Sequence, residues 1–572
     1  MADVTTSPRR GRVVPAILAG LLLAGCGSEP DRPAATPPAS TPPAPSGAAG
    51  ADPAARAAQL VATLGDEDLV GQVLMPYAYG SAADNVSAGS AAGNRKLAGV
   101  DTPAQMIAKY RLGGLILVGF SADDPTGGNQ ATTNVDNPTQ VRDLTTGLQT
   151  AARKLAAGSV PLLVGTDQEY GVVTRIKDGV TQLPSGMAFG AAGDPALTEK
   201  AWRAAGSELA ALGVNVDFAP DADVLRAQST VIGSRSYGAD PKNVAAQVGG
   251  AVRGLQGAGV AATLKHFPGH GDTAADSHQD LPVLKQSRAT LDRNDLPPFK
   301  SGIDAGAWLV MSGHLDTRAV DAGTPATFSH KVITDVLRKQ LGFSGVVVTD
   351  GMNMAPAQKW PAGEAAVRAL KAGNDLLLMP PNVGKAYDGL LAGLRDGSLP
   401  RDRLVEAATH VLTLKFRLAG HPAPAMSTLG SAPNKAAVQQ VSAAAVTQLR
   451  GPCTALPGPV TVTSSNGRQH TRDLLTRALR AAGVQVVGSG GRVVHLIGYG
   501  DGAGDLSADA AVTVAMDTPY LLAKAKSERL LATYSSTESS MAALAAVLAG
   551  KAKPTGRAPV PVSGLPATSC GG

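Results

Sequence analysis

The chain has 572 residues, of which 44% are hydrophobic and 17% are charged, and its formal net charge is +5. This length is more than one hydrophobic core usually serves, so we expect two domains with additional terminal segments. Aromatic residues make up only 3% of the chain and no block of Lys and Arg stands out, which argues against a nucleic acid as partner.

The amino end has the pattern of a targeting segment. An arginine-bearing start precedes an apolar run from Val13 to Ala24, which is too short to span a bilayer as a permanent helix. The run ends in Leu-Ala-Gly-Cys at positions 23–26, which resembles the lipobox of bacterial lipoproteins. The resemblance implies that residues 1–25 are a signal peptide and that Cys26 is acylated, anchoring the protein to the extracytoplasmic side of the cell membrane. An ordinary secretory signal and a short membrane anchor are the alternatives.

The next segment, residues 26–55, is rich in Pro, Ala and Ser and has almost no large apolar side chain. Such a composition buries too little surface to offset the entropy lost on ordering. We therefore predict a disordered, partly extended stalk.

From residue 56 to 425, short apolar runs alternate with segments of helical pattern such as 195–212 and 241–257. The runs lack polar alternation, as expected for strands covered on both faces. Eight such units predict a (β/α)8 barrel with its active residues at the carboxyl ends of the strands, while loosely patterned connections leave an incomplete barrel as the alternative. The predicted strands are Gly71–Met75, Gly114–Val118, Pro161–Thr166, Val214–Phe218, Ala262–His266, Trp308–Ser312, Gly345–Thr349 and Asp375–Met379.

Residues 426–572 are predicted to form a smaller α/β sandwich domain. Helices are expected at 434–449 and 538–548. No GxGxxG motif or P-loop follows a strand, so the domain has no nucleotide-binding signature. The predicted strands are Val460–Ser464, Gln485–Val487, Val493–Ile497, Ala511–Ala515 and Leu530–Tyr534.

Two cysteines, Cys453 and Cys570, stand near the start and at the end of this second domain. In an oxidising compartment they are candidates for a disulfide that closes the domain, with two separate thiols as the alternative. The chain has no CxxC pair, which argues against a zinc ribbon or a redox motif.

Carboxylate and imidazole groups gather just after the predicted barrel strands. Asp350 directly follows the seventh strand, and His278 and Asp276 lie in a long loop after the fifth. Cleavage of a glycosidic bond needs one carboxylate at the anomeric carbon and one proton donor at the leaving oxygen. Asp350 suits the first role, although it could instead cap a following helix, and the imidazole of His278 suits the second. In an extended loop, residues two apart point the same way, so Asp276 can orient the imidazole of His278.

The loop after the fifth strand also carries five residues of metal-ligand type. Their spacing matches neither HxHxDH nor HExxH, and Pro-Gly between the first two histidines would break a helical pair of ligands. We therefore expect neither a metal nor another cofactor. The five residues are His266, His270, Asp272, Asp276 and His278.

The segment KHFPGHGDTAADSH, residues 265–278, resembles the signature of family 3 glycoside hydrolases, in the branch of β-N-acetylglucosaminidases that recycle or remodel peptidoglycan. Three more motifs stand in the family's order: Asp-Gln-Glu from 167, Ile-Gly-Ser-Arg-Ser-Tyr-Gly from 232, and Thr-Asp-Gly-Met from 349. The resemblance is strong over about 56–420 and weaker in the second domain.

The resemblance implies a role for each matching residue. Asp350 would be the covalent nucleophile of a retaining double displacement, with His278 as acid/base and Asp276 as its orienting partner. His270 and Asp272 are expected to stabilise the loop, and His314 and Asp217 to support the site. The residues implied for sugar binding are Asp167, Arg175, Arg235, Lys265 and His266.

One position departs from the family. Relatives often have Gly where this chain has Tyr170, so the tyrosine would crowd or stack on the sugar site. The expected partner is a peptidoglycan-derived saccharide with terminal β-linked N-acetylglucosamine. Two alternatives remain: a phosphorylase, in which phosphate replaces water, and a wall-binding lipoprotein without enzymatic activity.

Overall fold

The computed structural model describes residues 52–119 and 132–570. The predicted signal peptide, Cys26 and most of the predicted stalk lie outside this range. The last residues assigned to the stalk form the start of helix α1 (Pro53–Val61), which packs on α14 (Arg401–Leu418). The Arg56 guanidinium lies 4.2 Å from the centroid of the Phe416 ring, and such a cation–π contact helps to hold α1 in place. In the described part of the chain, no helix is both long enough and apolar enough to cross a membrane.

All eight predicted barrel strands are present, each within two or three residues of the expected bounds. Seven of them are shorter than the predicted runs because only the residues that pair with a neighbouring strand keep the ladder geometry, whereas β7 is longer by one residue at each end. The strands are β1 (Leu74–Met75), β2 (Gly114–Leu117), β3 (Leu163–Thr166), β6 (Val216–Asp217), β7 (Ala261–Phe267), β9 (Leu309–Ser312), β11 (Val346–Thr349) and β12 (Leu377–Leu378).

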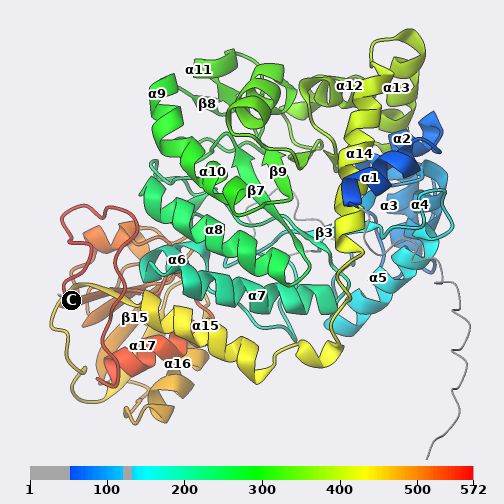
Figure 1. Ribbon diagram of the computed structural model, residues 1–572. Helices are drawn as coiled ribbons and strands as arrows, with labels where there is room; N and C mark the ends of the chain where they lie inside the picture. The colour runs from blue at the N-terminus through cyan, green and yellow to red at the C-terminus, as the bar shows by residue number, and fades with distance from the viewer. Residues whose placement is uncertain (1–51, 120–131, 571–572) are drawn as a thin grey trace, which may run out of the picture. The chain divides into compact units, whose positions relative to one another are not determined.

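The barrel closes through parallel pairing throughout. Six strands form one sheet in the order β11-β9-β7-β6-β3-β2, and β1 pairs with β12. Single bridges between Tyr77 and Ile116 and between Val348 and Leu376 join these two sheets at both edges. The ring therefore contains all eight strands, and the incomplete barrel considered from the sequence is not adopted. Strands β7 and β9, which pair in this ring, lie side by side in Figure 1.

Helices surround these strands and begin at identifiable caps. The predicted helices at 195–212 and 241–257 are α7 (Pro195–Ala211) and α8 (Pro241–Gly257). Each starts with Pro in the first turn after an Asp whose carboxylate accepts backbone N–H groups, an arrangement that satisfies otherwise unpaired donors. The other long barrel helices are α2 (Asp66–Gln72), α3 (Ala88–Ala98), α4 (Pro103–Tyr110), α5 (Pro138–Ala152), α6 (Gly186–Ala192), α10 (Leu296–Asp304), η4 (Lys331–Gln340), α12 (Ala362–Ala372) and α13 (Val383–Asp396).

The barrel interior is a packed apolar core. Strand residues such as Ile116, Val216 and Leu309 are fully buried in it, and Leu414 and Leu418 of α14 join the same cluster. Lys415 of α14 donates to Gln72, two residues before β1, so α14 covers the end of the barrel where the strands begin. The opposite end, where the strands finish, is left for the polar site.

The second domain is a five-stranded sheet with helices. Its strand order is β13-β17-β16-β15-β14, and only β13 runs antiparallel to its neighbour. The elements are α15 (Ala432–Ala445), β13 (Thr447–Arg450), β14 (Val460–Ser464), α16 (Gln469–Ala481), β15 (Arg492–Ile497), β16 (Val512–Ala515), β17 (Arg529–Ala532) and α17 (Glu538–Leu548).

Two predictions for this domain were wrong in part. The helix expected to reach residue 449 ends at Ala445, because the β-branched Val446 and Thr447 lead into β13, which pairs with β17. The strand expected at 485–487 makes only one bridge, from Val486 to Val460, and the glycine-rich stretch after it cannot prolong the ladder. Cys453 and Cys570 form a disulfide, with their Cα atoms 5.8 Å apart, which decides between the two alternatives that the sequence left open.

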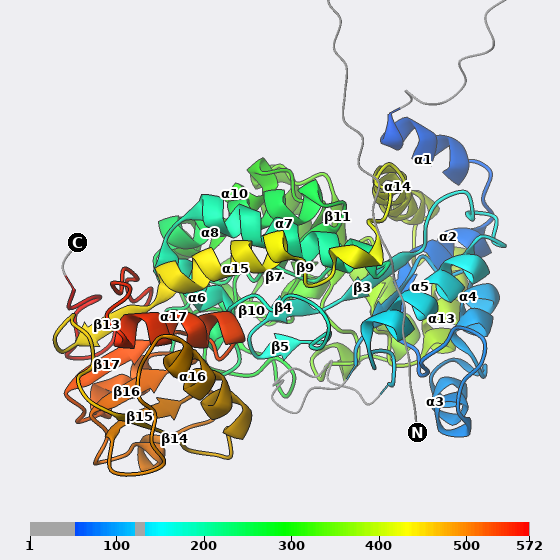
Figure 2. The same cartoon turned by 90° about the horizontal axis from the view of Figure 1, so that it is seen from below.

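The second domain lies against the barrel over a shared apolar cluster. Helix α15 packs on α6 and α7, as Figure 2 shows. Met187 and Ile232 of the barrel are buried in one cluster with Leu530 and Val560 of the second domain. The two domains therefore share a core as well as a chain connection.

Candidate active site

A polar pocket lies at the carboxyl ends of the barrel strands. It contains about 550 Å³ of space not filled by protein atoms, part of it open to solvent. Six of the residues predicted from the sequence line it, and they come from several of the strand ends. They are Asp167, Arg235, Lys265, His266, His278 and Asp350.

Asp350 follows β11 and accepts a hydrogen bond from the backbone N–H of Gly351 at 2.8 Å. Burial alone would raise the pKa of its carboxyl group. The imidazoles of His266, His314 and His278 and the Gly351 N–H outweigh that effect, and the pKa of Asp350 is lowered. An ionised carboxylate at the floor of a pocket is suited to nucleophilic attack. No capped helix starts at Asp350, since the next long helix, α12, begins at Ala362.

His278 and Asp276 form a hydrogen-bonded pair at the pocket entrance. Nδ1 of His278 lies 2.6 Å from Oδ1 of Asp276, and the side chains are 18% and 23% exposed. The hydrogen bond from His278 lowers the pKa of Asp276. The predicted pairing is present, but the loop is not extended: Oδ1 of Asp276 also accepts the backbone N–H of His278 at 2.9 Å, in a turn that brings both groups to one side.

Four charged side chains cross-link the opposite wall of the pocket. Nζ of Lys265 lies 3.0 Å from Asp167 and 2.6 Å from Glu169, and the Arg235 guanidinium binds Glu169 with two nitrogens at 2.7 and 2.9 Å. Arg175 lies below this layer, 3.7 Å from Asp167. Burial would raise the pKa of Glu169, but Arg235 and Lys265 lower it to about 2. The wall therefore presents fixed charges that can bind sugar hydroxyl and acetamido groups.

Sequence reasoning missed two buried acids that hold the residues of this wall in place, of which only Glu169 lines the pocket. Glu169 was read only as part of a motif, yet it is the acid that holds both Arg235 and Lys265. Asp223 was not singled out, although its Oδ2 lies 2.7 Å from Nδ1 of His266 and its Oδ1 accepts the backbone N–H of His270 at 2.6 Å. The signal that could have identified Asp223 is its place after a barrel strand, which it shares with the other acids of the site.

The residue types considered for a metal do not converge in the structure. Asp272 pairs with Arg226 at 3.2 Å, and Asp276 pairs with His278. A different group, Asp221, Asp223 and His266, brings donor atoms within 4.8 Å of one another. His266 is already hydrogen-bonded there to Asp223, and the Arg235 guanidinium lies 3.9 Å from Asp221. A cation so close disfavours a second one, so we interpret the group as a hydrogen-bonded support for His266.

The loop that carries His278 is anchored at its base. His270 is buried, and its backbone donates to Asp223. Arg226 donates from its backbone to the carbonyl of Gly271 at 2.8 Å, and its guanidinium lies 3.0 Å from the buried Asp295. The positions of His270 and Asp272 agree with the loop-stabilising part expected of them.

The two residues expected to support the site lie behind it. Nε2 of His314 lies 3.0 Å from the carbonyl oxygen of Gly351, next to Asp350, and Oδ1 of Asp217 accepts the backbone N–H of Gln168 at 3.0 Å. Both side chains are fully buried. They hold the backbone that carries the acids and do not line the pocket.

Tyr170 does not reach the sugar site, contrary to the expectation. It is 2% exposed and packs edge-on against Trp202, with the ring centroids 5.8 Å apart. Its φ of 65° is a left-handed conformation that favours glycine, which accounts for the Gly that relatives often have there. The tyrosine ends β4 of the β4–β5 hairpin (Gln168–Tyr170 and Val173–Thr174), and its side chain is part of the core.

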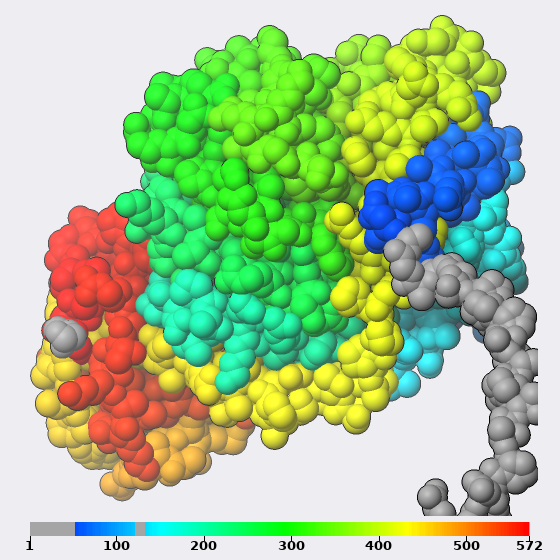
Figure 3. All heavy atoms as spheres, viewed as in Figure 1, coloured from blue at the N-terminus to red at the C-terminus, as the bar shows by residue number. Residues whose placement is uncertain are grey.

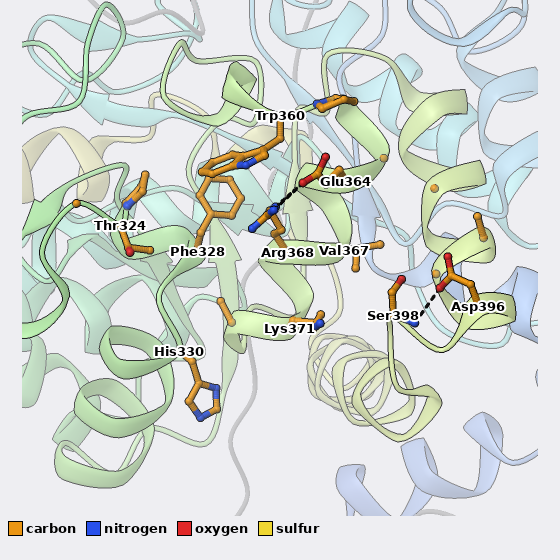
Figure 4. Close-up of a pocket in the computed structure, with 18 residues that line it drawn as sticks. Thr324, Phe328, His330, Trp360, Glu364, Val367, Arg368, Lys371, Asp396 and Ser398 are labelled. Carbon is orange, nitrogen blue, oxygen red and sulfur yellow. Dashed lines mark hydrogen bonds and ion pairs between the residues drawn. The ribbon is translucent and has the colours of Figure 1, made fainter.

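A larger cavity runs beside α12 and α13 and contains about 1600 Å³ of space not filled by protein atoms, part of it open to solvent (Figure 4). Trp360 meets Phe328 edge-on with centroids 4.7 Å apart, and the Arg368 guanidinium lies 5.1 Å from the Trp360 ring and 2.7 Å from Glu364. Two acids line the cavity: Glu364 pairs with Arg368, and Asp396 accepts the backbone N–H of Ser398 at 2.8 Å. None of the predicted catalytic residues lines it. The chemistry therefore belongs to the smaller pocket at the strand ends.

Comparison with known proteins identifies the family. The sequence model described as glycosyl hydrolase family 3 N terminal domain matches residues 69–414, which include every strand of the barrel. The chain belongs to glycosyl hydrolase family 3. The barrel followed by a second α/β domain, which the pattern of apolar runs and helical segments predicted, is the observed fold.

Two curated relatives of different length match the chain. The chain is 33% identical over 379 residues to beta-hexosaminidase A of Pseudoalteromonas piscicida, covering 61% of each chain. It is 39% identical over 291 residues to a beta-hexosaminidase of Stenotrophomonas maltophilia, covering 47% of this chain and 84% of the relative.

A solved family 3 structure matches both domains. The β-N-acetylglucosaminidase from Paenibacillus sp. str. FPU-7 superposes with a TM-score of 0.76 at 33% identity. The match covers 87% of this chain and 99% of that one. The arrangement of the barrel and the second domain is therefore shared with this relative.

Proposed function

We propose that this family 3 protein is an exo-acting β-N-acetylglucosaminidase that hydrolyses terminal β-linked N-acetylglucosamine. One observation carries the proposal: Asp350 and His278, from separate strand ends, line the same pocket, and Asp276 is hydrogen-bonded to His278. The printed names of the relatives, beta-hexosaminidases and a β-N-acetylglucosaminidase, support the same sugar.

The mechanism is a retaining double displacement. In the first step, the Asp350 carboxylate attacks the anomeric carbon while His278 gives its proton to the departing glycosidic oxygen. In the second step, His278 takes a proton from water, which attacks the anomeric carbon and frees Asp350. Asp276 accepts a hydrogen bond from Nδ1, so the proton that is exchanged sits on Nε2, and the imidazolium is stabilised.

The charged wall binds the sugar that is cleaved. Asp167 accepts from sugar hydroxyls, while Lys265, Arg235 and His266 donate to hydroxyl and acetamido oxygens. Arg175 acts from beneath, next to Asp167. Because Glu169 and Asp167 together pair with Arg235 and Lys265, these two cations are already balanced when a neutral sugar binds.

We further propose peptidoglycan fragments as the substrate source and Cys26 as the lipid attachment site. An exo-acting enzyme needs a pocket that accepts one terminal sugar at a time, and the proposal assigns this part to the pocket at the strand ends. A chain anchored at Cys26 through the stalk at 26–55 would work on the extracytoplasmic face of the cell membrane, near the wall. Labelling with a radioactive fatty acid tests this point: wild type should incorporate label and Cys26→Ser should not.

The activity is tested with two activated substrates that differ only at the acetamido group. We expect 4-nitrophenyl N-acetyl-β-D-glucosaminide to be cleaved and 4-nitrophenyl β-D-glucoside to be a much poorer substrate. Asp350→Asn should lower kcat by roughly 10³-fold or more, since the nucleophile is lost. Asp292→Asn, which changes an exposed carboxylate paired with Arg288, is the matched control and should keep wild-type kcat.

The same assay decides between the remaining alternatives. Proton NMR of the first product should show the β-anomer, as retention requires, and added phosphate should leave the product as free sugar. Formation of a sugar 1-phosphate would make the protein a phosphorylase. Absence of turnover on both substrates would contradict the proposal and favour a wall-binding role.

A further inference from the structure

The second domain contacts the barrel on both sides of Arg235. On one side, the Ser234 hydroxyl donates to Oδ1 of Asp517, which follows β16. On the other side, the backbone N–H of Ala239 donates to the carbonyl of Pro559 at 2.9 Å. Both contacts join residues about 300 positions apart in the chain, and Arg235 lies between them.

The contact at Pro559 is close and leaves no space for a side chain. A Cβ added to Gly238, whose φ is +135°, would lie 2.5 Å from the carbonyl oxygen of Pro559. The backbone of Arg557 continues the contact by donating to Ala191 of α6 at 3.0 Å. The C-terminal residues thus lie directly against the barrel, as the space-filling view shows (Figure 3).

Helix α6 also contacts the segment that carries Arg235. A Cβ at Gly186 would lie 2.0 Å from the carbonyl oxygen of Arg235, so α6 contacts the Arg235 backbone directly. Ser185, which precedes α6, donates through its hydroxyl to the carbonyl of Tyr534 in the second domain at 2.6 Å. The Arg235 segment is therefore held by α6 and by the second domain together.

The side chain of Arg235 needs this support because its donors are shared among several acceptors. It binds Glu169 with two nitrogens, donates to the carbonyl of Val231 at 3.1 Å and lies 3.3 Å from Nε2 of His266. A guanidinium keeps such a set of contacts only while its backbone stays in place, since each contact depends on direction as well as distance.

We propose that the second domain, through Asp517 and the residues around Pro559, positions the Arg235 segment for sugar binding. The proposal rests on the proposed function, because it assumes that Arg235 binds the sugar in the pocket. Asp517 and Pro559 are positioning residues: neither lines the pocket, and both act on Arg235 through its neighbours.

Asp517 offers a sharp pair of variants. Ser234 donates to it, so an amide oxygen can replace the carboxylate as acceptor, while alanine cannot. Asp517→Ala should lower kcat/KM for the N-acetylglucosaminide about tenfold, chiefly through KM, as expected when the part-buried hydrogen bond from Ser234 is lost. Asp517→Asn should stay within about threefold of wild type.

A matched control removes a buried hydrogen bond inside the second domain. Ser527 shares a 2.6 Å hydrogen bond with Thr513, away from the barrel. Ser527→Ala should lower Tm to a degree similar to Asp517→Ala but leave kcat/KM within about twofold of wild type. A purely structural role for Asp517 predicts that the two variants behave alike in both measurements.

Hydrogen exchange provides a readout that does not depend on activity. Amides of residues 229–239 should exchange faster in Asp517→Ala than in wild type, and not in Asp517→Asn or Ser527→Ala. Inactivity of the wild type would contradict the proposed function, while faster exchange would still support the positioning of the segment. Unchanged exchange and unchanged KM in Asp517→Ala would overturn the inference.

Discussion

At the scale of single residues, the site separates two kinds of carboxylate. Glu169 and Asp223 are buried and bound to cations or imidazole, so they hold other side chains in place. Within the described residues, the side chain of Asp350 accepts one hydrogen bond, from the Gly351 N–H. Asp350 also lines the pocket. A carboxylate with free lone pairs can attack a substrate, whereas a saturated one cannot, so contacts rather than residue type distinguish the nucleophile.

His278 carries a prediction at this scale. His278→Ala should lower kcat on a substrate with a poor leaving group by about 10²–10⁴-fold, because general-acid assistance is lost. An activated aryl glycoside should lose much less in its first step, because its leaving group needs no proton. Steady-state rates on 4-nitrophenyl N-acetyl-β-D-glucosaminide and on a natural disaccharide provide the comparison, with azide added as a substitute nucleophile for the second step. Equal losses on both substrates would contradict the acid role.

At the scale of elements, the two ends of the barrel have opposite character. The strand ends carry charged and imidazole groups, while α14 covers the strand starts with apolar side chains. Lys415 is the exception: it is buried on α14 and donates to Gln72 at 2.7 Å. Burial lowers the pKa of Lys415 from 10.5 to about 7, because the charged form loses its hydration.

This buried lysine predicts a pH-dependent stability. Between pH 7 and 10.5 the unfolded chain binds a proton at Lys415 that the folded chain does not bind. The contribution of Lys415 to the free energy of unfolding therefore rises with pH over this range. Lys415→Met should therefore be more stable than wild type at pH 7, and the difference should shrink toward pH 9 by at most about 1.4 kcal/mol per pH unit. Denaturant unfolding at both pH values tests this, with the exposed Lys385→Met as control. A constant difference would contradict the assignment.

At the scale of the whole molecule, the described chain from residue 52 onward behaves as one unit built from two domains. The shared apolar cluster, the Ser234–Asp517 hydrogen bond and the contact at Pro559 all cross between the domains. The disulfide between Cys453 and Cys570 ties the C-terminal segment that contains Pro559 back to the start of the second domain. Stability of the second domain and geometry of the pocket are therefore linked.

Removing that disulfide should destabilise the protein. It closes a loop with a sequence separation of 117 residues, and the double variant Cys453→Ser/Cys570→Ser should lose about 2–5 kcal/mol of unfolding free energy. Thermal unfolding of wild type with a reductant should approach that of the variant, which the reductant itself should leave unchanged. A variant as stable as oxidised wild type would show that packing alone holds the C-terminal segment.

Much of this protein follows from local sequence. Each barrel strand is a short apolar run that must be buried on both faces, so the eight strands and the barrel are predictable without tertiary information. The His278–Asp276 pair is also local, because two residues in one turn meet whatever the rest of the chain does. Asp350 is predictable because it ends a strand, and parallel strands bring their ends together.

Contacts between distant positions were decided only by the tertiary structure. Glu169 meets Arg235 across 66 positions, and Asp223 meets His266 across 43. Tyr170 turns toward Trp202 because of its backbone conformation, and β13 forms because β17 is there to pair with it. Such contacts depend on closure of the barrel and on the docking of two domains, and a sequence pattern records only what each residue meets nearby.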